Sequence, residues 1–244
     1  MSAIRQAICS WSGGKDSCLA LHLAIEQGFT VTTLIAMFEE AADRSRSHAL
    51  PESLVRAQAQ SLGVELLTPR ADWARYEAVF IETLAHAHGR GIEHAIFGDI
   101  DLIPHREWEE KVCARADMTA HLPLWGRPRP VVVDEVLRRD IKALCVCVNT
   151  RWLPQSFCGR PYDRQFIADL PDGVDACGEN GEFHTFVTHA PRFRWPVRAF
   201  VRGLRSYAGP PEYGGGHSFR HWRGPRTRTA RRRTLEDRYS YAIR

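Results

Sequence analysis

Residues 4–28 read IRQAICSWSGGKDSCLALHLAIEQG, and this stretch predicts the fold class of the chain. The apolar run 4–11 has the length and composition of a buried strand. The segment 16–27 is typical of an amphipathic helix, and Gly28 after it is a residue type that commonly ends helices. A strand that passes through a glycine turn into a helix is a unit from which helix-covered parallel sheets are built.

The same alternation of short apolar runs and longer amphipathic ones continues to about residue 150. Alternation at this spacing predicts an α/β fold with a doubly wound parallel sheet. The expected strands are 30–38, 64–68, 92–99 and 142–149, and the expected helices are 51–62, 71–89 with Asp72 as N-cap, 106–117 and 131–140. Such sheets bind ligands at the carboxyl ends of their strands, so residues 12–17, Asp99 and the segment after Leu124 should share one edge.

The pattern weakens after residue 150, where glycine and proline become frequent. A short helix within 160–171 and a strand over 182–188 are expected there. The chain should therefore contain a nucleotide-binding domain over 1–128, a smaller α+β substrate-binding domain over 129–191 and a basic, poorly ordered tail over 192–244. That tail holds fourteen arginines and three acids, whereas the whole chain has a net charge of only +4, so the body is mildly acidic.

The composition is that of a soluble globular protein, with 44% hydrophobic and 25% charged residues. No run of about 18 apolar residues exists, and the N-terminus lacks the pattern of a signal peptide, so no membrane segment is expected. The seven cysteines include no Cys-x-x-Cys pair. They are expected to be reduced, buried thiols of a cytoplasmic protein.

Residues 12–17, at the end of the first expected strand, have the chemistry of an anion site. Glycines allow left-handed backbone angles and bring amide groups close to phosphate oxygens. The helix start adds further amides and a partial positive charge. A lysine adds a full charge, and two serines add hydroxyl donors. The spacing differs from that of the Walker A loop. The candidate nucleotide-binding residues here are Ser12, Gly13, Gly14, Lys15, Asp16 and Ser17.

A second cluster of reactive side chains lies at residues 177–184, which read CGENGEFH. Two glycines permit a tight loop, so that Glu179 and Glu182 can converge although they are three positions apart. The two carboxylates could hold Mg²⁺ against phosphates, or bind ammonium and accept its proton. The alternative is a polar surface hairpin in which the glycines only make the turn.

His48, Asp99 and Arg106 are secondary candidates. His48 precedes a helix where a base or ribose could reach it, and Asp99 follows a strand at a position that often serves ligands. His105 and Arg106 begin the next helix and could meet an anionic substrate. Each could equally be a surface residue, and Asp99 could coordinate a metal or simply cap the following turn.

Residues 12–17 match the Ser-Gly-Gly-x-Asp-Ser signature of the N-type ATP pyrophosphatases, also called the PP-loop superfamily. More closely, the chain resembles the diphthine–ammonia ligase family over about residues 5–191. The segments that carry the resemblance are SGGKDSCLAL, the stretch from His48 into QAQSLGVEL, REWEEKVCARADMTAHLPLW and CGENGEFHTFV. The basic tail departs from that family, whose members finish with a short ordered strand segment.

The resemblance implies an adenine-nucleotide-alpha-hydrolase-like fold and an ATP-dependent, AMP-forming ligase. Such an enzyme adenylylates a substrate carboxylate, releases pyrophosphate and transfers ammonia to form an amide. The implied partners are ATP, Mg²⁺, ammonium and a carboxylate, which is diphthine on elongation factor 2 in an archaeal or eukaryotic source. A homodimer is a candidate assembly. The implied catalytic residues are Lys15, Glu179 and Glu182. The nucleotide would be bound by residues 12–17 together with His48 and Asp99. The substrate would be bound by Asn180, His184 and Arg106, and Mg²⁺ would be held by Asp16 and Glu182.

Two other function classes remain open from the sequence. A PP-loop enzyme that modifies RNA could use the arginine-rich tail to hold nucleic acid. A nucleotide-binding protein without catalysis would need the loop at residues 12–17 but not the two glutamates.

Overall fold

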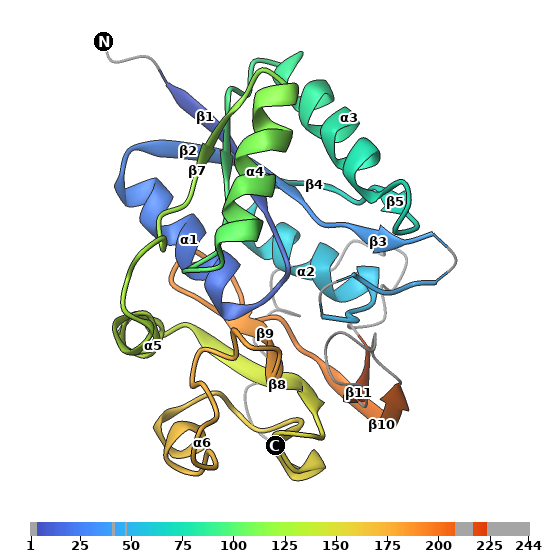
Figure 1. Ribbon diagram of the computed structural model, residues 1–244, viewed down its shortest axis with the longest axis vertical. Helices are drawn as coiled ribbons and strands as arrows, with labels where there is room; N and C mark the ends of the chain where they lie inside the picture. The colour runs from blue at the N-terminus through green and yellow to red at the C-terminus, as the bar shows by residue number, and fades with distance from the viewer. Residues whose placement is uncertain (1–3, 41, 47, 208–216, 224–244) are drawn as a thin grey trace, which may run out of the picture.

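The computed structural model of the chain describes residues 4–40, 42–46, 48–207 and 217–223. Its central sheet has five parallel strands in the order β4-β2-β1-β6-β7 (Figure 1). The strands are β1 (Arg5–Ser10), β2 (Phe29–Ile35), β4 (Glu65–Leu67), β6 (His94–Ile96) and β7 (Thr119–His121). The chain winds outward from β1 in one direction and then in the other, so the order reverses between β1 and β6. Ligands of doubly wound sheets bind at such a reversal.

Helices cover both faces of this sheet, as the sequence predicts. On one face, α1 (Lys15–Glu26) and α2 (Glu52–Leu62) share a core with α5 (Arg129–Arg138). On the other face, α3 (Tyr76–His88) and α4 (Ile103–Arg115) form a separate core. Successive β1 side chains belong to opposite cores, Ile8 to the α3–α4 side and Cys9 to the α1 side. This alternation is the two-residue period of a strand that is buried on both faces.

A second, antiparallel sheet lies beyond the carboxyl ends of the central strands (Figure 1). Its strand order is β10-β11-β8-β9, and the helices α6 and η1 accompany it. The bounds are β8 (Lys142–Asn149), β9 (Phe183–His189), β10 (Phe200–Tyr207), β11 (His217–Arg223), η1 (Gln155–Phe157) and α6 (Arg164–Ala168). A separate parallel pair, β3 (Phe38–Glu39) with β5 (Arg70–Ala71), extends the first layer. The chain is therefore α/β with a C-terminal α+β part.

Three local expectations differ from the structure. The strand expected over 30–38 is divided into β2 and β3. The helix expected from residue 71 begins at Tyr76, because the Asp72 carboxylate accepts the Arg75 amide at 2.9 Å and so closes the turn before the helix. No strand was expected after residue 192, yet β10 and β11 lie there; they pair with each other, and β11 also pairs with β8. Residues 208–216 and 224–244, where most of the expected disorder falls, are outside the described residues.

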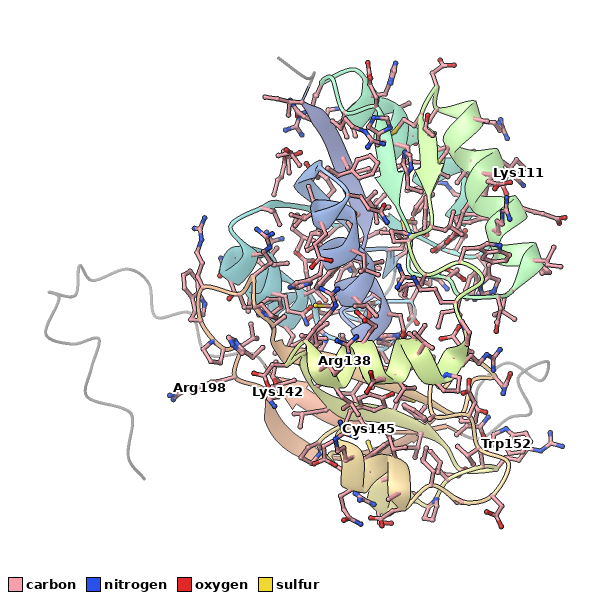
Figure 2. All side chains as sticks on the ribbon, turned by 90° about the vertical axis from the view of Figure 1, so that its left-hand side faces the viewer. Lys111, Arg138, Lys142, Cys145, Trp152 and Arg198 are labelled. Carbon is pink, nitrogen blue, oxygen red and sulfur yellow. The ribbon has the colours of Figure 1, made fainter. Side chains whose placement is uncertain are left out.

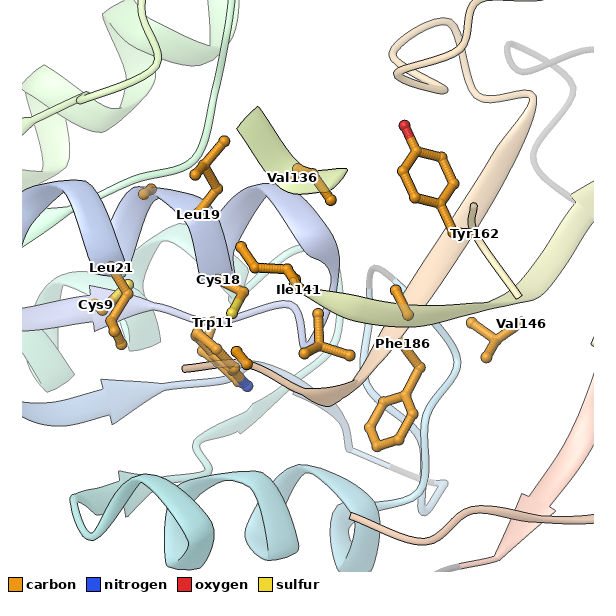
Figure 3. Close-up of a cluster of buried hydrophobic side chains, with 14 of the residues drawn as sticks. Cys9, Trp11, Cys18, Leu19, Leu21, Val136, Ile141, Val146, Tyr162 and Phe186 are labelled. Atoms are coloured by element: carbon orange, nitrogen blue, oxygen red, sulfur yellow. The ribbon is translucent and has the colours of Figure 1, made fainter. Parts of the chain in front are cut away.

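One apolar core joins the two sheets. Trp11 at the end of β1 and Cys18 on α1 pack in the same cluster as Ile141, Val146 and Phe186 of the second layer (Figure 3). All seven cysteines are buried and unpaired, and Cys145 lies inside the second layer (Figure 2). Within the described residues, no helix is both long and apolar enough to cross a membrane.

A buried glutamine also ties the two layers together. The Gln58 side chain on α2 is fully buried, and its Nε2 donates to the backbone oxygens of Gly13 at 3.0 Å and Val187 at 2.7 Å. Its Oε1 accepts from Trp11 Nε1 at 2.8 Å. The Val187 amide in turn donates to the Gly13 oxygen at 2.9 Å. These bonds fix residues 12–17 against β9.

Replacement of Gln58 should destabilise the protein strongly. Gln58→Leu takes the Gln58 partner from buried groups of Val187 and Trp11, each at a cost of about 1–3 kcal/mol, and leaves the Gly13 oxygen with only the Val187 amide. We expect a loss of several kcal/mol in the free energy of unfolding measured with urea. Gln60→Leu, on the exposed face of the same helix, is the control and should change little. Equal stabilities of the two variants would contradict this role.

Candidate functional site

The loop at residues 12–17 has the geometry of a phosphate-binding turn. Gly13 has a φ of +84°, and α1 begins directly after Gly14. A Cβ on Gly14 would lie 2.4 Å from His48 Cε1, and one on Gly13 would lie 2.9 Å from Leu50 Cδ1. Both positions therefore require glycine, and the amides at the helix start remain close to whatever occupies the site.

Hydroxyl groups accept hydrogen bonds from two of these amides. The Gly14 amide donates to Ser12 Oγ at 3.2 Å, and the Lys15 amide donates to Thr185 Oγ1 of β9 at 3.1 Å. Ser12 Oγ and Ser17 Oγ lie 3.1 Å apart. Phosphate oxygens could replace these hydroxyls as acceptors. The arrangement confirms that the loop and the segment around residues 177–185 meet.

Lys15 is a buried charge at this junction, with only 2% of its surface exposed. Its Nζ donates to Asp16 Oδ2 at 2.7 Å and to the Cys177 carbonyl at 2.5 Å. The rings of Tyr162 and Phe183 lie 5.7 and 5.9 Å from Nζ. Burial opposes the charge on Lys15, but nearby acids, Asp16 foremost, outweigh it and raise the pKa of the ammonium. Lys15 therefore stays protonated.

Two acids near Lys15 have pKa values above their usual range. Burial raises the pKa of Asp16 although the Lys15 charge opposes the shift, and Asp16 Oδ1 has no hydrogen-bond partner. Burial, followed by the charge of Asp16, raises the pKa of Glu179 to about 8. Asp99 contributes to both shifts. A Cβ on Gly98 would lie 2.9 Å from the Ser17 amide nitrogen, so the segment after β6 lies beside residues 12–17, as expected for a shared edge.

The segment after Leu124 also reaches this edge. The Gly126 amide donates to the Ile100 oxygen at 2.8 Å, directly after Asp99. Arg106 on α4 lies 5.1 Å from the Trp125 ring and pairs with Glu110 at 2.6 Å. Arg106, which the sequence predicts to bind substrate, is thus near the site but engaged with other side chains.

Glu182 is placed differently from the expectation. It is 1% exposed, and its carboxylate accepts the Asp175 amide at 3.1 Å together with the amide and the side-chain Nδ2 of Asn180, each at 2.9 Å. The left-handed glycines at 178 and 181 turn the loop so that this carboxylate lies beneath it. The geometry favours a loop-holding role for Glu182 and does not support the catalytic and Mg²⁺-binding roles expected for it.

Two further side chains, those of Asn180 and Arg129, help to hold this loop. Arg129 was not singled out from the sequence. Arg129 binds Asp101 through two nitrogens at 2.7 and 2.9 Å, and its Nη1 lies 2.8 Å from Asp175 and 3.3 Å from Asn180 Oδ1. Arg129 is the first residue of α5, and that position is the only sequence signal for its role. The Asn180 amide, a predicted substrate ligand, is used within the protein.

Two histidines lie against the glycine turn. The rings of His48 and His184 stack with their centroids 4.7 Å apart. Burial, the His184 ring and Lys15 together hold the pKa of His48 well below its usual value, so His48 is neutral. Its Nδ1 is buried and has no hydrogen-bond partner. Both residues are therefore placed where a nucleotide-binding and a substrate-binding role were expected.

The side chains fit a magnesium ion only in part. Mg²⁺ takes one or two carboxylates and completes its shell with water and phosphate oxygens. Asp16, with a buried and unpartnered Oδ1, suits that pattern, whereas Glu182 has its oxygens occupied. In the part of the chain that the structure describes, no group of three or more His, Cys, Asp or Glu side chains is arranged to hold a metal ion.

Comparisons with known proteins agree with this architecture. Residues 5–120 match the sequence profile of the diphthamide synthase N-terminal domain, and residues 130–205 match that of the C-terminal domain. The second match ends within β10, at residue 205, so it extends past residue 191.

The curated relatives that match the chain are named diphthine–ammonia ligase. The diphthine–ammonia ligases of Bos taurus and Homo sapiens are each 25% identical over 210 residues, covering 75% of this chain and 78% of theirs. That of Danio rerio is 23% identical over 218 residues and 82% of its length is covered. A crystal structure described as a predicted subunit of tRNA methyltransferase from Methanocaldococcus jannaschii aligns with 76% of this chain and 98% of its own at 15% identity, with a TM-score of 0.41. From the matched domains, the chain belongs to the diphthamide synthase family.

Proposed function

We propose that this chain is an ATP-dependent ligase that joins ammonia to a substrate carboxylate. The observation that carries the proposal is the pair of hydrogen bonds made by Lys15. Its amide donates to Thr185 Oγ1 and its Nζ donates to the Cys177 carbonyl. A loop suited to phosphate and a loop rich in acids thereby form a single site. An ATP-dependent amide ligase would use the first loop to bind phosphates and the second to transfer protons.

In the proposed first step, a carboxylate oxygen attacks the α-phosphorus of ATP, and pyrophosphate leaves. Negative charge builds on the departing pyrophosphate, and fixed amide dipoles with a buried ammonium are suited to stabilise it. Lys15 would exchange its bond with Asp16 for a phosphate oxygen. Asp16, so released, would be free to hold Mg²⁺, which would add positive charge at the phosphates.

In the proposed second step, ammonia attacks the acyl-adenylate and AMP leaves. Glu179 is proposed for this step, because the charges of Asp16, Lys15 and Asp99 act on its pKa, whereas the Glu182 carboxylate holds the loop. Near pH 7 it carries a proton, and it becomes a carboxylate above about pH 8. It is therefore suited to hold or exchange a proton near the reacting amine.

The carboxylate substrate is proposed from the family. Relatives are named diphthine–ammonia ligases, so diphthine on elongation factor 2 is the proposed acid for an archaeal or eukaryotic source. A bacterial source would exclude diphthine and leave the reaction class in place. The direct test is whether the purified protein makes AMP and pyrophosphate from ATP only when an acid and ammonium are both supplied.

Loss of the buried ammonium should abolish nucleotide chemistry. Lys15→Ala removes the cation that faces the phosphates and should cost about 2–4 kcal/mol of transition-state stabilisation, as for other preorganised donors. The measurement is ATP–pyrophosphate exchange in the presence of the acid. Lys111→Ala, an exposed position on α4 (Figure 2), is the control and should keep the wild-type rate. Exchange that survives in a folded Lys15→Ala protein would contradict the proposal.

The raised pKa of Glu179 predicts a pH-dependent stability. Folded Glu179 keeps its proton up to about pH 8, whereas an unfolded glutamate loses it near pH 4.3. The folded state therefore binds more protons in this window, and wild-type stability should fall between about pH 5 and pH 8 relative to Glu179→Gln.

Urea unfolding at pH 5, 6.5 and 8 measures this difference. The exposed Glu107→Gln variant is the matched control and should follow the wild type at each pH. If the stability difference between wild type and Glu179→Gln stays constant across the three pH values, the carboxyl is not protonated as described.

A further inference from the structure

An aspartate and a histidine form a hydrogen-bonded pair at the edge of the proposed site. Asp99 follows β6, and His105 lies in the first turn of α4; His105 Nδ1 and Asp99 Oδ1 are 2.6 Å apart. Since a carboxylate can only accept, the hydrogen of a neutral imidazole sits on Nδ1 and leaves Nε2 as an acceptor. The His105 side chain is 56% exposed, and among the residues described Asp99 is its only hydrogen-bond partner.

Close packing brings this pair to the phosphate loop. Gly98, immediately before Asp99, has no room for a side chain, because a Cβ there would lie 2.9 Å from the Ser17 amide nitrogen and 3.0 Å from the Asp16 carbonyl carbon. The end of β6 is thus pressed against the start of α1. Asp99 cannot shift without moving the loop.

A second acid, Glu109, holds the aspartate from the other side. Glu109, one helical turn after His105, is only 5% exposed and hydrogen-bonds Asp99, while its Oε2 has no partner. Two carboxyl groups can share a hydrogen bond only if one is protonated. Burial, followed by the charge of Asp99, raises the pKa of Glu109 to about 11, so Glu109 is the donor. Bonds from His105 and Glu109 keep the pKa of Asp99 low in spite of burial.

The groups that face His105 are acidic. The hydrogen bond that His105 donates to Asp99 is the main cause that raises the pKa of His105; burial opposes it, and the charges of Asp99 and Glu179 add to it. Glu109 acts through Asp99. His105 is therefore held at the end of β6 that packs against the start of α1, and its half-exposed ring offers Nε2 to an incoming molecule.

We propose that His105 accepts the proton of the ammonium substrate, with Asp99 and Glu109 as positioning residues. The assignment rests on the proposed function and names the base of its second step. An N–H bond of ammonium breaks, its proton goes to Nε2, and its electron pair remains on nitrogen. That pair forms the C–N bond with the acyl-adenylate, the bond from the acyl carbon to the phosphate oxygen breaks, and AMP leaves. The amine then loses a second proton to water.

The decisive variant is His105→Gln, which keeps a hydrogen-bond donor for Asp99 but has no basic nitrogen. With diphthine-bearing elongation factor 2 as the acid, ATP–pyrophosphate exchange should remain at the wild-type rate. Ammonia-dependent amide formation should fall about 100-fold or more, the usual effect of losing a general base. Hydroxylamine is already unprotonated at neutral pH, so hydroxamate formation should be restored.

A matched control and a second measurement separate the possible failures. His86→Gln, on the exposed end of α3, should leave both half-reactions unchanged. If wild-type protein shows no exchange with this acid, diphthine fails as the proposed substrate and this assignment fails with it. If exchange persists but His105→Gln makes amide from ammonium as fast as wild type, only the assignment is overturned.

Imidazole ¹⁵N spectra of the full chain test the geometry without any substrate. We expect neutral His105 to carry its hydrogen on Nδ1, and its titration midpoint to fall in Asp99→Asn. A neutral ring with its hydrogen on Nε2 would overturn the assignment, since that nitrogen could not accept a proton.

Discussion

Burial of the Lys15 ammonium is the constraint on which the rest of the site depends. A charge removed from water must find partners, and here they come from two directions: Asp16 on the same helix turn and the Cys177 carbonyl from the second layer. The phosphate loop therefore cannot be completed by the central sheet alone. Thr185 and Val187 on β9 fix the backbone of the same loop. The two matched domains consequently meet at one candidate site.

The same burial distributes protons unevenly among the neighbouring acids. Glu179 and Glu109 keep their protons well above the pH at which a glutamate usually loses its proton. Asp99 remains ionised because two hydrogen-bond donors point at it. Groups whose environments separate their pKa values in this way are suited to different roles in acid–base chemistry. A polyphosphate adds negative charge, which neutral carboxyl groups tolerate better than carboxylates. The acids that look unfavourable around a phosphate site are thus compatible with it.

Local chemistry could be predicted from the sequence, and long-range partners could not. The glycine turn and the helix after it follow from neighbouring residues, so residues 12–17 and the doubly wound sheet were predicted. Glu182 could not be placed, because its spacing from Glu179 does not say which carboxylate the glycines turn inward. Gln58 and Thr185 act on a loop that is distant in the chain. Likewise, β11 forms because β8 offers it an edge, and nothing local to residues 217–223 predicts that.

A crystal structure with Mg²⁺ and a non-hydrolysable ATP analogue tests the central claim most directly. The account predicts that the terminal phosphates accept hydrogen bonds from the amides at the start of α1, and that Lys15 Nζ leaves Asp16 to contact a phosphate oxygen. An analogue bound elsewhere, with Lys15 still held between Asp16 and the Cys177 carbonyl, would contradict it.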